Sequence, residues 1–83
     1  MNASKISKEL AAQFPRAVAL KSRIKGYRRT STGFSVKQLS DSVLVYWETE
    51  AFTTSNRLAE MQAFLSQQGY TVVDQGHQLE VTA

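Results

Sequence analysis

The 83-residue sequence contains no cysteine, one proline and one histidine. The absence of cysteine excludes disulfide bonds, thiolate nucleophiles and zinc–sulfur sites, so packing alone must hold the fold. No stretch approaches the roughly 18 apolar residues of a membrane-spanning helix, and the first residues lead into no apolar signal-peptide core. We therefore expect a cytoplasmic protein that neither spans nor binds a membrane.

The parts of a catalytic or metal site are also missing from the sequence. His77 follows Gly76 in a predicted turn and has no His or Cys companion, so we interpret it as an exposed turn residue rather than a ligand. No serine stands in a Gly-x-Ser-x-Gly motif, and there is no phosphate-binding glycine loop, dinucleotide fingerprint or His-Glu-x-x-His pair. We predict no catalytic residues, no enzymatic activity, and no metal or cofactor.

Acidic residues are scarce in the first half of the chain. Residues 1–37 hold nine lysines and arginines against the single acid Glu9, which gives +8, while residues 38–83 hold Arg57 against six acids, which gives −5. The two halves sum to the net charge of +3. This asymmetry suggests an anionic partner, although the two halves could instead attract each other.

The length and composition predict one small folded domain over residues 1–83. Hydrophobic residues make up 42% and charged residues 20% of the chain, which is ordinary for a globular protein and not for a disordered one. The pattern of elements predicts an α+β fold of order α-β-β-β-α-β-β, with a mostly antiparallel sheet backed by two helices.

The first helix is expected over residues 4–14, with Ser4 as its cap and an apolar residue every fourth position. Pro15 should end it, because proline disfavours helical geometry in the residue before it and has no amide hydrogen. Residues 16–25 fit two patterns. Period-two alternation favours a strand, whereas a helix that begins at Pro15 would also collect the cations on one face.

A loop is expected over residues 26–33, followed by strands over residues 34–39 and 43–48. If the turn between the strands has an even residue count, Phe34 and Val36 share a face with Val45 and Trp47. The second face of the sheet then carries Lys37, Leu39, Leu44 and Tyr46. We interpret Trp47 as a core residue.

The second helix is expected over residues 57–68, after capping residue types at 53–56 and before a left-handed cap at Gly69. Its apolar stripe of Leu58, Met61 and Leu65 should face the core. Strands are expected over residues 70–74 and 78–81. A two-residue turn between them would place Val72 opposite Leu79.

The strongest functional feature is a run of basic residues with one aromatic ring. The predicted nucleic-acid contacts are Lys21, Arg23, Lys25, Tyr27, Arg28, Arg29 and, at the border, Lys37. Lysine and arginine can neutralise backbone phosphates, and tyrosine can stack on an unpaired base. The alternative is a solvated strand whose charges protect a sheet edge. No recognition helix for sequence-specific readout can be identified.

A third possibility is a protein-interaction module, either a homodimer or a modulator of a host protein. Leu44 and Tyr46 on the second sheet face could dock against another subunit. This surface and the basic run are independent of each other.

The run Val43-Leu44-Val45-Tyr46-Trp47-Glu48, the segment Gly69-Tyr70-Thr71-Val72 after a helix, and Leu79-Glu80-Val81 carry a resemblance. Together with Arg57-Leu58-Ala59-Glu60 to Leu65 in the helix, they extend over residues 43–81, about half the chain, and in this region the sequence resembles small uncharacterised proteins of bacteriophages that infect actinobacteria. The matching residues are structural, so no functional residue is carried over. The resemblance implies a viral protein that acts inside an infected bacterium by binding host or phage macromolecules.

Overall fold

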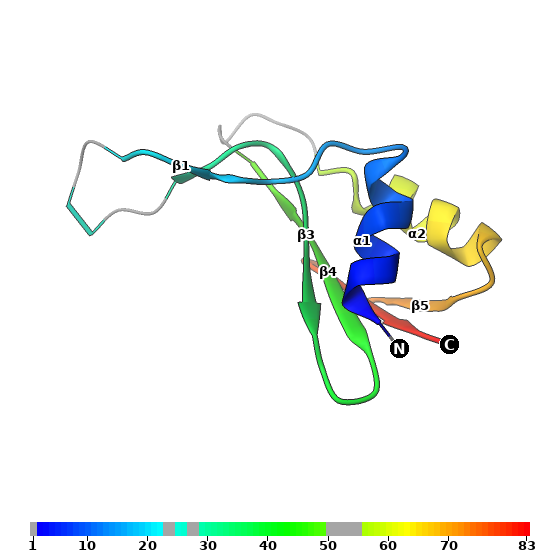
Figure 1. Cartoon of the computed structure of the whole chain (residues 1–83). Helices are drawn as coiled ribbons and strands as arrows, with labels where there is room; N and C mark the ends of the chain where they lie inside the picture. Colours follow the sequence, from blue (N-terminus) through cyan, green and yellow to red (C-terminus); the bar gives the residue numbers. More distant parts are fainter. Residues whose placement is uncertain (1, 23–24, 27–28, 50–55) are drawn as a thin grey trace.

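The computed structural model describes residues 2–22, 25–26, 29–49 and 56–83. Its elements are α1 (Ala3–Ala11), β1 (Ala19–Leu20), β2 (Arg29–Thr30), β3 (Gly33–Gln38), β4 (Val43–Glu48), α2 (Leu58–Gln67), β5 (Thr71–Asp74) and β6 (Leu79–Thr82). They form a four-stranded antiparallel sheet of order β3-β4-β6-β5 and a separate two-stranded sheet, β1-β2 (Figure 1). The predicted α+β class and element order are confirmed, with β2 as an added short strand in the predicted loop.

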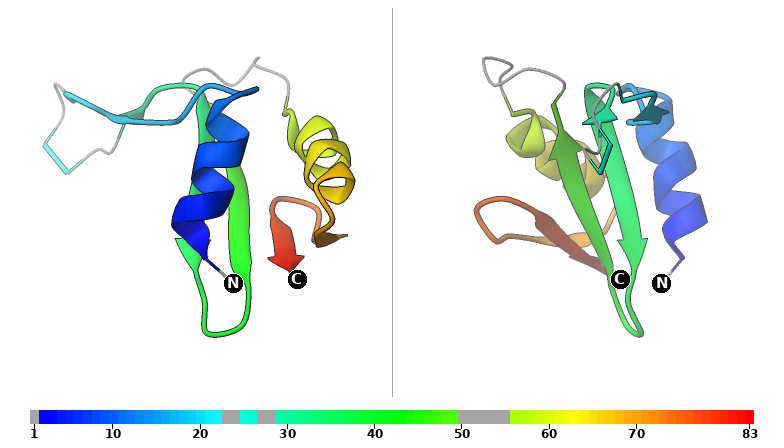
Figure 2. Two further views of the ribbon diagram at one scale, coloured as in Figure 1. Left: turned by 45° about the vertical axis from the view of Figure 1, so that its right-hand side comes forward. Right: turned by 90° about the vertical axis from the view of Figure 1, so that its left-hand side faces the viewer.

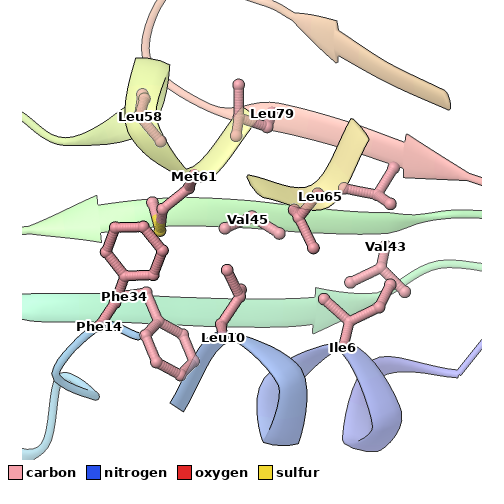
Figure 3. Close-up of a cluster of buried hydrophobic side chains, with 11 residues drawn as sticks. Ile6, Leu10, Phe14, Phe34, Val43, Val45, Leu58, Met61, Leu65 and Leu79 are labelled. Atoms are coloured by element: carbon pink, nitrogen blue, oxygen red, sulfur yellow. The ribbon is translucent and has the colours of Figure 1, made fainter. Parts of the chain in front are cut away.

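Both helices cover the same face of the four-stranded sheet, α1 beside β3 and α2 beside β5 (Figure 2). The core between the layers is apolar (Figure 3); its fully buried members are Ile6, Leu10, Phe34, Val43, Val45, Met61, Leu65, Leu79 and Val81. Because these side chains alternate along the strands and recur every three or four residues along the helices, one face of each element is buried.

Helix α1 begins one residue earlier than predicted, because Asn2 and not Ser4 is its cap. The Asn2 side-chain oxygen accepts hydrogen bonds from the backbone amides of Ser4, at 2.8 Å, and Lys5, at 3.4 Å. The helix ends at Ala11. Phe14 lies just beyond it and is still buried in the core.

Strands β3 and β4 pair in the predicted even register. Phe34 lies opposite Trp47 and Val36 opposite Val45, which places all four on the helix-covered face. Trp47 is half-buried and packs against the core, as predicted. Alternation then leaves Lys37 and Leu44, which are paired with each other, on the uncovered face.

Helix α2 ends in the predicted left-handed cap. Gly69 has φ of 97°, and its amide donates to the carbonyl of Ser66 while the amide of Tyr70 donates to that of Leu65. These two bonds form a Schellman motif, which satisfies carbonyls that the helix leaves free. At the start of α2, the Asn56 side-chain oxygen accepts a hydrogen bond from the Leu58 amide at 2.7 Å. Residues 53–55, the rest of the predicted capping cluster, lie outside the described residues.

The predicted register of the last hairpin is wrong by two residues. Val72 lies opposite Val81, not Leu79, and Leu79 lies opposite Asp74. The turn itself lies one residue later than predicted: the Gln75 amide donates to the Gln78 carbonyl at 2.9 Å, which places Gly76 and His77, and not Gln75 and Gly76, at its centre, and the Asp74 side chain accepts from the Gly76 amide. The shift is even, so the apolar residues keep their face.

Candidate nucleic-acid interface

The segment from residue 17 to residue 32, here called the basic arm, contains β1 and β2. Its described residues, 17–22, 25–26 and 29–32, lie at one end of the molecule (Figure 1). Ala19 pairs with Thr30 and Leu20 with Arg29. The Ser31 amide donates to the Val18 carbonyl, and the Val18 amide donates to the Ser31 hydroxyl, each at 2.9 Å. Ala19–Leu20 is a strand and none of the described residues among 16–25 is helical, in agreement with the strand interpretation, although the strand is much shorter than predicted and Lys25 lies in a turn.

The arm is fixed to the main sheet at its base by residues 15–17. The Phe34 amide donates to the Pro15 carbonyl at 2.9 Å, and the Ala17 amide donates to the Phe34 carbonyl at 2.8 Å. This approach requires glycine at position 33, since a Cβ there would lie 2.5 Å from the Pro15 oxygen. Gly33, predicted as the end of a loop, is thus the residue that lets the arm leave the sheet.

Three of the predicted contacts lie on the described part of the arm. Lys21, Lys25 and Arg29 are all exposed. The Arg29 guanidinium donates to the Lys21 carbonyl at 3.3 Å, which holds the side chain across the two strands. The other predicted arm contacts, Arg23, Tyr27 and Arg28, lie outside the described residues.

The remaining predicted contact, Lys37, is not on the arm. It is exposed on the uncovered sheet face opposite Leu44, near the far end of β3 from Gly33. Lys21, Lys25 and Arg29 therefore all belong to the basic arm, whereas Lys37 lies on another surface.

Three described carboxylates of the second half bond to residues of the body. Glu48 accepts from the Ser35 hydroxyl, Glu80 from the Ser42 hydroxyl, and Glu60 pairs with Arg57. Among the described residues, no carboxylate forms an ion pair with Lys21 or Lys25. Their charge is available to a partner.

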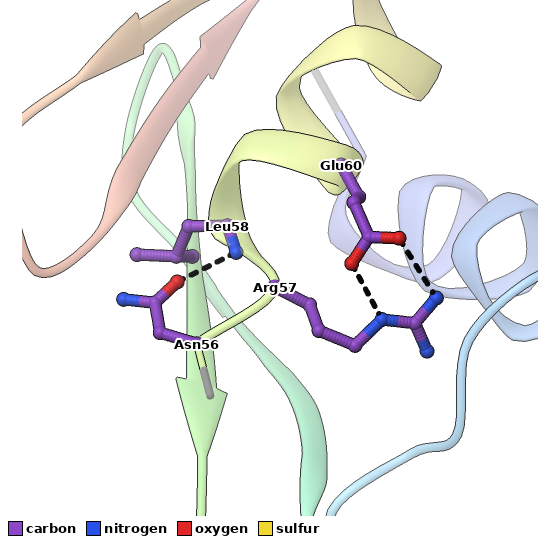
Figure 4. Close-up of polar contacts among 4 residues, drawn as sticks. All are labelled: Asn56, Arg57, Leu58 and Glu60. Carbon is purple, nitrogen blue, oxygen red and sulfur yellow. Dashed lines mark hydrogen bonds and ion pairs between the residues drawn. The ribbon is translucent and has the colours of Figure 1, made fainter. Parts of the chain in front are cut away.

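Arg57, the one lysine or arginine of residues 38–83, lies at the start of α2 and pairs with Glu60 (Figure 4). Its Nε lies 2.8 Å from a Glu60 oxygen, and its guanidinium carbon lies 4.7 Å from the Phe14 ring centroid and 5.7 Å from that of Trp47. The hydrogen bond raises the pKa of Arg57 and lowers the pKa of Glu60. Arg57 thus joins α2 to the core aromatics.

A second basic surface, which the sequence analysis did not single out, lies between α1 and β3. A cleft of about 280 Å³ is lined by Ala3, Ser4, Ser7, Lys8, Arg16 and Val36. Ser4, Ser7 and Lys8 share one helix face because they are three and four residues apart. That spacing is visible in the sequence, but the approach of Arg16 depends on how residues 15–17 pack against β3.

His77 is exposed in the turn between β5 and β6, as predicted. No three His, Cys, Asp or Glu residues gather in the described part of the chain into a group that could hold a metal ion. None of the described helices is both long enough and apolar enough to cross a membrane.

The sheet face proposed as a docking surface offers less apolar area than the sequence suggested. Leu44 lies between Lys37 of β3 and Glu80 of β6 and is only 9% exposed, and Tyr46 is half-buried. Val73 on β5, which the sequence analysis did not name, is 51% exposed. A docking partner would meet Val73 before Leu44.

Comparisons with protein-family models, curated proteins and solved structures gave no match. The resemblance to bacteriophage proteins therefore stays a prediction.

Proposed function

We propose that this protein is a non-catalytic nucleic-acid-binding protein that holds backbone phosphates with its basic arm. The observation that carries the proposal is the charge of the arm. Residues 17–32 include five lysines and arginines and no acid, and no described carboxylate pairs with Lys21 or Lys25. A phosphate backbone is the partner that most directly uses such a surface, since each neutralised phosphate releases counterions.

The expected contacts are Lys21, Arg23, Lys25, Arg28 and Arg29, with Tyr27 as a ring that can stack on a base. Lys37, which the sequence suggested as a border contact, lies on the uncovered sheet face and is not included. A two-stranded ribbon is narrow enough to enter the major groove of a duplex. Contacts to phosphates fix the position of a protein on its nucleic acid but do not read its sequence. We therefore expect little preference among sequences.

Salt dependence tests this proposal. The logarithm of the affinity falls with the logarithm of the salt concentration, with a slope of about −0.9 for each phosphate contact. Five contacts therefore predict a loss of affinity of roughly 500-fold between about 50 and 200 mM salt. The measurement is fluorescence anisotropy of a labelled random duplex and a labelled single strand at both salt concentrations. Absence of binding to either at low salt would refute the proposal, and a dimer in light scattering would then favour the protein-interaction alternative.

A further inference from the structure

We infer that the cleft between α1 and β3 is a second, separate binding site for a phosphate group. Its polar lining consists of the hydroxyls of Ser4 and Ser7 and the cations of Lys8 and Arg16, and no carboxylate lines it. Arginine and lysine bind phosphate through charge-assisted hydrogen bonds, and serine hydroxyls add neutral donors. The lining therefore has donors and positive charge but no competing anion.

Arg16 is held at the cleft before any ligand arrives. Residues 15–17 are bonded to Phe34 through two backbone hydrogen bonds of 2.9 and 2.8 Å. The Arg16 guanidinium carbon lies 5.9 Å from the Phe34 ring centroid, which is within the range of a cation–π contact. A side chain that is already oriented loses less entropy when it binds a ligand.

The helix terminus itself is not the site. The Asn2 side chain already accepts from the amides of Ser4 and Lys5, and the Gln38 side chain accepts from the Ala3 amide at 2.7 Å. A ligand in the cleft must be held by side chains. Among the described residues, neither Lys8 nor Arg16 forms an ion pair, so an anion would relieve the repulsion between two unpaired cations that line one cleft.

The size of the cleft limits the ligand. At about 280 Å³, it falls just below the range of sites for drug-sized molecules, which begins near 300 Å³. The cleft therefore has room for a phosphate group and for part of the molecule that carries it. The phosphate could belong to the nucleic-acid backbone that continues from the arm, which rests on the proposed function, or to a small phosphorylated molecule, which does not.

The first test is independent of nucleic acid. Backbone amide NMR spectra of the whole chain are recorded during titration with inorganic phosphate against chloride at equal ionic strength. We expect saturable shifts at Ser4, Ser7, Lys8 and Arg16 that disappear in the double variant K8Q/R16Q. The matched control K5Q removes a lysine of the same helix that does not line the cleft, so its shifts should match those of the unchanged protein.

The second test identifies the source of the phosphate. If a nucleic-acid phosphate enters the cleft, K8Q/R16Q makes the slope of the logarithm of duplex affinity against the logarithm of salt concentration shallower by about one, whereas K5Q leaves this slope unchanged. Saturable phosphate shifts with an unchanged duplex slope, or with no duplex binding at all, assign the site to a small phosphorylated molecule. The inference is overturned if phosphate gives no saturable shift at these residues and K8Q/R16Q binds duplex like K5Q.

Discussion

The body and the basic arm of this protein are held together in different ways. In the body, two helices and four strands enclose a shared core in which nine large side chains are fully buried. In the described part of the arm, two paired residues on each strand and a few loop hydrogen bonds hold the strands, and Val18 is 53% exposed. Stability therefore resides in the body and positive charge in the arm, so the two properties should change separately under mutation.

The largest expected loss of stability comes from the core. Phe34→Ala removes a fully buried ring of the core between the sheet and the helices, and it should lower the free energy of unfolding by about 3–5 kcal/mol. Val18→Ala on the arm should change it by no more than about 0.5 kcal/mol. Urea denaturation measures both, and similar losses in the two variants would contradict the division between body and arm.

A smaller loss is expected at the junction between the two regions. Gly33→Ala places a methyl group against the backbone of residues 15–17 and should cost about 1–3 kcal/mol, the usual range for overpacking. The base of the arm should also loosen, which hydrogen exchange of the Ala17 amide would detect. Ser35→Ala in the same strand should cost less than about 1 kcal/mol and leave that amide protected.

The contact between α1 and the start of β5 should make stability sensitive to alkaline pH. The Tyr70 hydroxyl donates to a Glu9 oxygen at 3.0 Å, and burial, followed by this carboxylate, raises the pKa of Tyr70. Because the folded-state pKa is the higher one, this contribution is complete below the unfolded value of about 10 and is lost as pH rises through the folded value.

Tyr70→Phe should therefore cost about 1 kcal/mol at neutral pH. The difference between the two proteins should shrink above a pH of about 10, where only the unchanged protein loses this contribution. Urea denaturation at neutral and alkaline pH measures it. A difference that grows with pH would contradict the prediction that ionisation of Tyr70 removes this contribution to stability.

Much of the body follows from local patterns in the sequence. Alternation along residues 34–36 and 45–47 was enough to predict the register of β3 and β4, because a one-residue slip would turn the apolar side chains toward solvent. Gly69 predicts the end of α2, because glycine readily adopts the left-handed conformation of a helix C-cap. Asn2 was missed because it lies outside the apolar repeat, although Asn and Ser are equally good cap residues.

The features that the sequence did not predict depend on contacts between distant segments. The glycines at positions 26 and 33 predict a loop between them, whereas Arg29–Thr30 forms strand β2 through its pairing with β1. The register of the last hairpin is set by side-chain and backbone bonds within the turn. The cleft joins residues of α1 to Arg16 through the packing at Gly33, which no local pattern encodes.

The smallest change in stability and the most direct test of the function come from the arm cations. Lys21→Gln together with Lys25→Gln should alter the free energy of unfolding by less than about 0.5 kcal/mol, since both side chains are exposed and form no ion pair with a described carboxylate. The measurement is the slope of the logarithm of duplex affinity against the logarithm of salt concentration. It should become shallower by about two in the double variant and by less than one in the Lys37→Gln control. A slope unchanged by the loss of both arm lysines would contradict the claim that the arm binds phosphates.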